Sequence, residues 1–416
     1  MKLDDIERRL GEWVQQGMRK MADEILPRLQ SVAMPFQRED DAEPGDACDV
    51  TCYVARDDGI FPEEGTVGEP LSPEEDCPQA TSLPGGTLLA ALSRVPELPV
   101  VPDDRTLVLC RERDAGRGED SCLAVQADGR AFLGVFDGCG GSGAKTYAAF
   151  EGHTGAWVAS RAATLAARQW FETGYAPGGD GGASLLESGI GVALAECRDL
   201  QPSRQLLMGS LSRDFPTTLA GFAVDNDGHA DVYWCGDSRC YLLDGGGLHQ
   251  LTADDAVVQD AMRAVREDAP MTNVISASAP FVIHHRTLEL KRPGLLIAAT
   301  DGCFGYVPSP MAFEALLLKA LRGAKDMDSW RRALDADIGA VSGDDYTLAA
   351  YSFGYADFKA LRTALVKRQK RLEVKYPQAE ADEAALFDQW EEYRASYERL
   401  LPNEKDTMRE AEHDGD

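Results

Sequence analysis

Four acidic positions in the sequence share one local context, the end of an apolar run that is expected to form a strand. Asp137 follows "AFLGVF", Asp301 follows "LLIAAT", Asp237 lies in the turn after "VYWC", and Asp344 with Asp345 directly precedes "YTLAAYSF". Carboxylates at strand ends can converge on one rim of a sheet, where they repel each other unless a cation lies between them. Hard cations such as Mg²⁺ and Mn²⁺ prefer such oxygen ligands. The alternative is that each aspartate is simply a good turn residue.

The elements that would position these aspartates can be predicted along the chain. Short β-rich runs begin near residue 105, and the pattern becomes helical between residues 146 and 200. Next come a meander of strands and a helical stretch at 254–268. They are followed by a buried strand at 294–300, two helices at 310–321 and 327–338, and a last strand at 346–353. This order predicts an α+β fold, a layered β-sandwich flanked by α-helices, with helical N- and C-terminal appendages.

The chain divides into four segments by composition. Residues 1–35 carry apolar side chains at steps of three and four, which predicts an N-terminal amphipathic helix. Residues 36–104 are acidic and rich in proline and glycine, so a linker or irregular segment is expected. Residues 105–354 form the predicted domain, and residues 355–416 form a charged helical C-terminal extension. That extension could pack on the domain or offer a surface to a protein partner, but a solvated appendage is the favoured interpretation.

Composition excludes several classes of function. The net charge of −28 argues against nonspecific binding to nucleic acid or to anionic lipid. No apolar run approaches the roughly 18 residues of a membrane span, and the start "MKLDDIERRL" is unlike a signal peptide. The 10 cysteines occur without CxxC pairs, which favours reduced thiols over disulfides or zinc ligands. The sequence therefore predicts a cytoplasmic protein with no nucleic-acid or membrane partner.

The wording and order of the motifs resemble the PPM-type, or protein phosphatase 2C-like, metal-dependent serine/threonine phosphatases. The matching pieces are "RGEDS" (117–121), "GVFDGCGG" (134–141), "TTLAGF" (217–222), "WCGDSRCYLL" (234–243), "LTADD" (251–255), "LIAATDGCFG" (296–305) and "GDDYTLAAYSF" (343–353). Each piece alone is weakly specific, whereas the ordered set across residues 105–354 is fairly specific. The resemblance implies the same fold, a central β-sandwich flanked by helices, and hydrolysis of phosphoserine or phosphothreonine on phosphoprotein substrates.

The resemblance also implies a metal centre. Two Mn²⁺ or Mg²⁺ ions would lower the pKa of a shared water and neutralise phosphate oxygens, so attack on phosphorus would need no protein nucleophile. The resemblance implies that Asp137 bridges the two ions and that the Gly138 carbonyl binds one of them. Asp301 and Asp344 would complete the first site, and Glu119 and Asp120 would reach the second directly or through water. Asp237 would pair with Asp301 at a weaker third site.

Three positions depart from the family's pattern. Cys139 stands where many members have a histidine that is thought to protonate the leaving alkoxide. A thiol, with an ordinary pKa of about 8.5, is a poor general acid, so a packing variant is favoured over a catalytic role. The phosphate-contacting arginine usually lies where this chain has Ala115, and Arg117 or Arg113 could serve instead. Gly305 replaces an aspartate that is often present. These departures leave open a second hypothesis, a catalytically silent protein that binds phosphoproteins or partners.

Local alternatives explain less of the sequence. The stretch "GCGGSGAKT" (138–146) approximates a P-loop, but its lysine does not directly follow the glycine, and it lacks the arginine that a cysteine phosphatase needs. The stretch "DNDG" (225–228) resembles the start of a calcium loop, but no bidentate glutamate follows and a hairpin turn is sufficient. His153 could supply a proton, although a surface or capping histidine is the favoured interpretation.

Overall fold

The computed structural model describes residues 85–95, 104–178, 182–200, 214–267, 269–377 and 383–402. The amphipathic helix predicted for residues 1–35 lies outside these residues, and so does most of the predicted linker of residues 36–104. The described part of that linker contributes one helix, α3 (Gly85–Ser93). The boundaries predicted for the four segments stay predictions.

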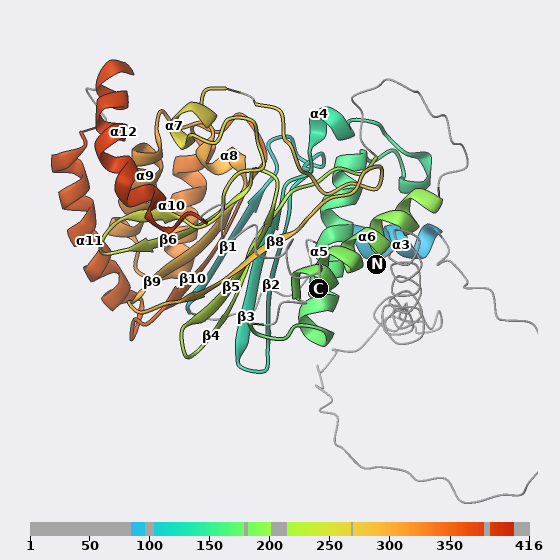
Figure 1. Cartoon of the computed structure of the whole chain (residues 1–416), viewed down its shortest axis with the longest axis horizontal. Coiled ribbons are helices and arrows are strands. Elements are labelled where there is room, and N and C mark those ends of the chain that lie inside the picture. The colour runs from blue at the N-terminus through green and yellow to red at the C-terminus, as the bar shows by residue number, and fades with distance from the viewer. Residues whose placement is uncertain are drawn as a thin grey trace, which may run out of the picture. The chain divides into compact units, whose positions relative to one another are not determined.

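Two antiparallel sheets that face each other form the centre of the fold (Figure 1). The first sheet has the strand order β1, β10, β9, β6, β7, with bounds β1 Thr106–Arg111, β6 Arg239–Asp244, β7 Leu248–Gln250, β9 Gly294–Ala299 and β10 Tyr346–Phe353. The second sheet has the order β2, β3, β4, β5, β8, with bounds β2 Ser121–Ala127, β3 Arg130–Phe136, β4 Leu219–Asp225, β5 His229–Cys235 and β8 His284–Glu289. The consecutive strands β1 and β2 thus belong to different sheets.

The apolar side chains form three layers because successive residues of a strand point to opposite faces of its sheet. Val135, Phe222 and Leu296 lie in the layer between the two sheets. The outer face of the second sheet, which includes Phe132, packs against one group of helices. The outer face of the first sheet, which includes Ile297, packs against another. The predicted layered β-sandwich flanked by α-helices is confirmed.

Polar residues begin the helices that cover these outer faces. The second sheet is covered by α5 (Gly155–Thr173) and α6 (Gly182–Asp199), and the first by α9 (Pro310–Gly323) and α10 (Met327–Gly339) (Figure 1). The side chains of Thr154, Ser309 and Asp326 each accept a hydrogen bond from a backbone N–H in the first turn of α5, α9 and α10. Such caps satisfy donors that a helix leaves without a partner.

The C-terminal helices α11 (Phe358–Lys375) and α12 (Glu383–Tyr397), followed by the 3₁₀ turn η4 (Glu398–Leu400), pack beside the helices on the first sheet. Their outer residues are exposed, whereas their inner residues belong to the same core as the first sheet. These inner residues are Leu361, Leu365, Leu372, Trp390, Tyr393 and Tyr397. The interpretation of this segment as a solvated appendage therefore fails for the inner faces of both helices.

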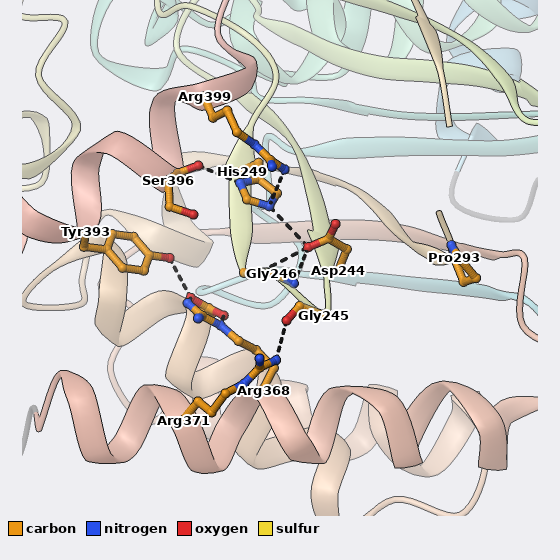
Figure 2. Close-up of polar contacts among 12 residues, drawn as sticks. Asp244, Gly245, Gly246, His249, Pro293, Arg368, Arg371, Tyr393, Ser396 and Arg399 are labelled. Carbon is orange, nitrogen blue, oxygen red and sulfur yellow. Dashed lines mark hydrogen bonds and ion pairs between the residues drawn. The ribbon is translucent and has the colours of Figure 1, made fainter. Parts of the chain in front are cut away.

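A buried polar network also joins the C-terminal helices to the domain (Figure 2). Glu314 of α9 is fully buried and accepts hydrogen bonds from Arg368 Nε (2.6 Å) and Nη2 (2.8 Å) of α11 and from the Tyr393 hydroxyl (2.6 Å) of α12. In the same region the Arg371 guanidinium donates to the Gly245 carbonyl in the turn between β6 and β7. Burial of a carboxylate is tolerated here because three donors share its charge.

The helix predicted for residues 254–268 is wrong for most of its length. A single turn, α7 (Ala261–Ala264), forms after Asp260, which caps it. The residues before it make tertiary contacts instead: the Asp254 carboxylate pairs with Arg239, and Asp255 accepts a hydrogen bond from the Gly236 N–H. Strand β8 was not predicted, since its sequence "HHRTLE" is polar and only partly buried.

No helix within the described ranges is both long enough and apolar enough to cross a membrane. The cytoplasmic location stays a prediction.

Candidate metal centre

Strand register places three of the predicted aspartates at one end of the first sheet. Ala299, the last residue of β9, pairs with the first residue of β6 and lies opposite the third residue of β10. Asp301 follows β9, Asp237 precedes β6 and Asp344 precedes β10. The antiparallel pairing therefore brings all three to the same edge.

The second sheet supplies the remaining acidic residues in the same way. Ser121, the first residue of β2, pairs with Phe136, the last residue of β3. Glu119 and Asp120 precede β2, and Asp137 follows β3. These two groups meet, because the charges of Asp120 and of the aspartates of the first sheet act on Asp137.

The electrostatics of this cluster are those of carboxylates crowded away from water. Burial, followed by the charges of Asp120, Asp301 and Asp237, raises the pKa of Asp137 well above its ordinary value. Burial and the charge of Asp301 raise the pKa of Asp237 to about 7. Burial likewise raises the pKa values of Glu119, Asp120 and Asp344. A bound cation would remove this repulsion.

The donor chemistry fits hard divalent cations, since the cluster offers carboxylate oxygens. Across the described ranges, however, no group of three or more acidic, histidine or cysteine side chains is arranged to hold a metal ion as it stands. The cluster thus offers oxygen donors of the kind that a hard divalent cation prefers.

Asp345, which the sequence groups with Asp344 but which is not among the implied ligands, ties the two sheets together at this site. The Asp345 carboxylate accepts hydrogen bonds from the backbone N–H groups of Arg113 (2.8 Å) and Glu119 (2.6 Å). The Thr300 hydroxyl, next to Asp301 in the chain, donates to Asp120 (3.0 Å). Asp345 therefore holds the loop between β1 and β2 against the start of β10. Its only sequence signal was the second aspartate of "GDD".

Two glycines are required by close backbone contacts in the cluster. A Cβ atom at Gly138 would lie 2.7 Å from the carbonyl oxygens of Ala156 and Glu119. A Cβ atom at Gly302 would overlap with the Asp345 carbonyl. A side chain at either position would push apart the segments that carry the acidic residues.

The two candidate arginines lie in different surroundings. The Arg113 guanidinium donates to the Gly343 carbonyl, directly before Asp344. Its charge acts on Asp344. Arg117 is also exposed, and its backbone N–H closes a turn with the Asp114 carbonyl (2.9 Å). Of these two candidates, Arg113 is therefore the one that the fold brings beside the carboxylates.

Cys139 lies next to the cluster as a protonated thiol. Burial, followed by the charges of Asp137, Asp237 and Asp301, raises its pKa well above the ordinary value, so it is not a thiolate nucleophile. His153 stacks on the Trp157 indole, with ring centroids 3.7 Å apart.

The motifs "GDSR" and "LTADD" have a structural role that sequence reasoning did not assign. The Arg239 guanidinium and the Asp254 carboxylate form an ion pair at 2.6 Å whose side chains are only 2% and 4% exposed. The guanidinium also lies over the Phe304 ring, 4.4 Å from its centroid. This pair fixes the start of β6, two residues after Asp237.

A family model described as Protein phosphatase 2C matches residues 111–336, which is more than half of the chain. The chain belongs to the protein phosphatase 2C family. The resemblance predicted from the motifs is therefore confirmed. No curated protein gives a significant match.

Solved structures of bacterial phosphatases also align with the chain. The serine/threonine phosphatase PstP/Ppp of Mycobacterium tuberculosis is 22% identical, with 60% of this chain and 98% of that chain covered and a TM-score of 0.45. A serine/threonine phosphatase of Staphylococcus aureus is 17% identical, with 60% and 94% covered and a TM-score of 0.47. Because these scores are below 0.5, the family assignment rests on the sequence match.

Proposed function

We propose that this chain is a Mn²⁺- or Mg²⁺-dependent phosphatase that hydrolyses phosphoserine and phosphothreonine in proteins. The observation that carries the proposal is the convergence of Asp120, Asp237 and Asp301 on Asp137 from two sheets. Membership of the protein phosphatase 2C family supports the same conclusion. We propose the cytoplasm as its location and phosphoproteins as its substrates.

In this proposal the acidic residues hold the cations. Asp137 would serve both ions, and the Gly138 carbonyl would bind one of them. Asp301 and Asp344 would complete the first site, and Glu119 and Asp120 would serve the second directly or through water. Asp237 would add a weaker third site with Asp301. Bound ions would supply a water of lowered pKa and neutralise phosphate oxygens.

The other residues of the site would position these ligands and the substrate. The Thr300 hydroxyl orients the Asp120 carboxylate through its hydrogen bond. Asp345 holds the loop that carries Arg113 and Glu119. Arg113 would contact the phosphate oxygens, with Arg117 as the second candidate for that role. Cys139 would fill space as a neutral thiol rather than transfer a proton.

The test is hydrolysis of p-nitrophenyl phosphate and of a phosphothreonine peptide by the full chain, with and without Mn²⁺. Asp137→Asn should abolish turnover and the Mn²⁺-induced rise in melting temperature. A matched control is Asp227→Asn in the exposed turn between β4 and β5, which should change neither.

Each outcome of this test has a definite meaning. Hydrolysis that needs Mn²⁺ and is lost in Asp137→Asn supports the phosphatase. Unchanged hydrolysis in that variant refutes the bridging role of Asp137. Binding of Mn²⁺ without turnover favours the second hypothesis, a catalytically silent member of the family that binds phosphoproteins. The observation that favours this hypothesis is Ala115 at the position where the family usually has its phosphate-contacting arginine. Absence of both binding and turnover refutes the metal centre.

A further inference from the structure

Two cysteines from different sheets face each other beside the candidate metal centre. Cys110 is two residues after Val108 on β1, and Cys122 is two residues before Ala124 on β2. Val108 and Ala124 both contribute to the layer between the sheets. Because residues two apart on a strand point to the same face, both thiols point into the space between the sheets.

The contacts of these thiols agree with this placement. The Cys110 and Cys122 side chains lie close enough to interact with each other. The Thr347 hydroxyl of β10 donates to the Cys110 sulfur (3.3 Å), and its backbone N–H donates to the Thr300 hydroxyl (2.9 Å), which holds Asp120. The thiol pair is thus linked by hydrogen bonds to a predicted metal ligand.

Access separates Cys110 from the other cysteines of the described residues. Cys110 is exposed, whereas Cys122 and Cys139 are partly exposed. The remaining described cysteines are buried: Cys197, Cys235, Cys240 and Cys303. A small oxidant from solvent can therefore reach the Cys110 thiol first and find the Cys122 thiol beside it.

The chain between the two cysteines, residues 111–121, consists of the end of β1, the loop of residues 112–120 and the start of β2. It carries both candidate arginines, Arg113 and Arg117, and the acidic residues Glu119 and Asp120. A bond between Cys110 and Cys122 would close this loop into a ring at the edge of the sandwich, where its two ends already lie on facing strands.

We propose that Cys110 and Cys122 form a reversible disulfide when the protein meets hydrogen peroxide, and that this disulfide lowers activity at the metal centre. The peroxide oxidises one thiol to a sulfenic acid and releases one water. The second thiol attacks that sulfur, forms the S–S bond and releases a second water. A dithiol reduces the disulfide and restores both thiols.

The loss of activity follows from the change in sulfur separation. A disulfide requires the two sulfur atoms to approach each other to about 2.05 Å. That movement pulls the start of β2 toward β1 and removes the thiol that accepts from Thr347. Metal ligands tolerate displacements of only about 0.2 Å, so Glu119 and Asp120 would lose their alignment. This consequence rests on the proposed function, whereas formation of the disulfide does not.

The experiment treats the full chain with hydrogen peroxide and maps its cysteines by mass spectrometry under non-reducing conditions. We expect a peptide pair joined through Cys110 and Cys122, lighter by about 2 Da than the two reduced peptides and separated by dithiothreitol. Cys110→Ser and Cys122→Ser should each lack this pair. Oxidation of Cys110 to an acid without the cross-link, or a cross-link to another cysteine, would overturn the proposal.

Activity is measured on the same samples. Mn²⁺-dependent hydrolysis should fall about tenfold on oxidation and return with dithiothreitol, as expected for a disturbed ligand shell. The activity of Cys122→Ser should resist peroxide. A mapped disulfide with unchanged hydrolysis would overturn the link to the metal centre. If the reduced protein has no hydrolytic activity, the proposed function fails, and mapping still decides whether the disulfide forms.

Discussion

Replacement of Arg368 by methionine should destabilise the protein strongly because it isolates a buried charge. Glu314 is fully buried, and the Arg368 side chain is only 12% exposed. At an effective dielectric constant of about 20, opposite charges about 4 Å apart attract by about 4 kcal/mol. Removal of one partner from a buried ion pair costs about 3–5 kcal/mol, because the remaining charge stays desolvated. We expect Arg368→Met to lower the free energy of unfolding by that amount.

Urea denaturation followed by tryptophan fluorescence measures this change. Arg371→Met is the matched control, because Arg371 lies about one helical turn after Arg368 on the same helix but is exposed. In Figure 2 its guanidinium contacts only the backbone carbonyl of Gly245. This substitution should lower the free energy of unfolding by about 0.5 kcal/mol or less. Tyr393→Phe removes one hydrogen bond to the same carboxylate and should cost about 1.5–3 kcal/mol.

The reasoning also predicts how the loss can be reversed. With Glu314→Leu added to Arg368→Met, no charge is left buried, and much of the lost stability should return. The argument fails if the free energy of unfolding of Arg368→Met lies within about 1 kcal/mol of the wild-type value, or falls no further than that of Arg371→Met. In either case the buried Glu314 carboxylate does not depend on this ion pair.

Two further predictions concern acid stability and the substrate site. Burial opposes ionisation of Asp231, but hydrogen bonds from His285, Thr287 and Tyr175 lower its pKa from 3.8 to about 2. The ionised carboxylate therefore stabilises the folded protein fully above pH 3.8, and this contribution is lost as the pH falls through about 2. Asp231→Asn should cost roughly 2 kcal/mol at pH 7 and little near pH 2, measured by urea denaturation; an equal cost at both values would contradict this. Arg113→Ala should raise KM for a phosphopeptide about tenfold, and more than Arg117→Ala does; the reverse order would favour Arg117.

The strands and the strand-end aspartates could be predicted because their signals are local. Asp137 and Asp301 each end a continuous apolar run, and such runs fit strands that are buried on both faces. The order of the elements then determined the layered fold.

The features that could not be predicted depend on partners far away in the sequence. The Asp345 carboxylate acts on Arg113, 232 residues earlier. In β8 the polar residues His284 and His285 stack on Trp234 and Tyr233 of β5, so that aromatic contacts replace the apolar alternation that marks a strand. Nothing in the local pattern of a polar segment reveals such a neighbour.

The pairing of β1 with β10 has a consequence for the biosynthesis of the protein. β1 lies at the edge of the first sheet, and its neighbour in that sheet is β10, which the ribosome makes about 235 residues later. At about 5–20 residues per second, β1 waits for roughly 10 to 50 seconds before its partner exists. Asp345, directly before β10, is also what holds the loop with Glu119. The nascent chain therefore completes its acidic cluster only after most of the domain has been synthesised.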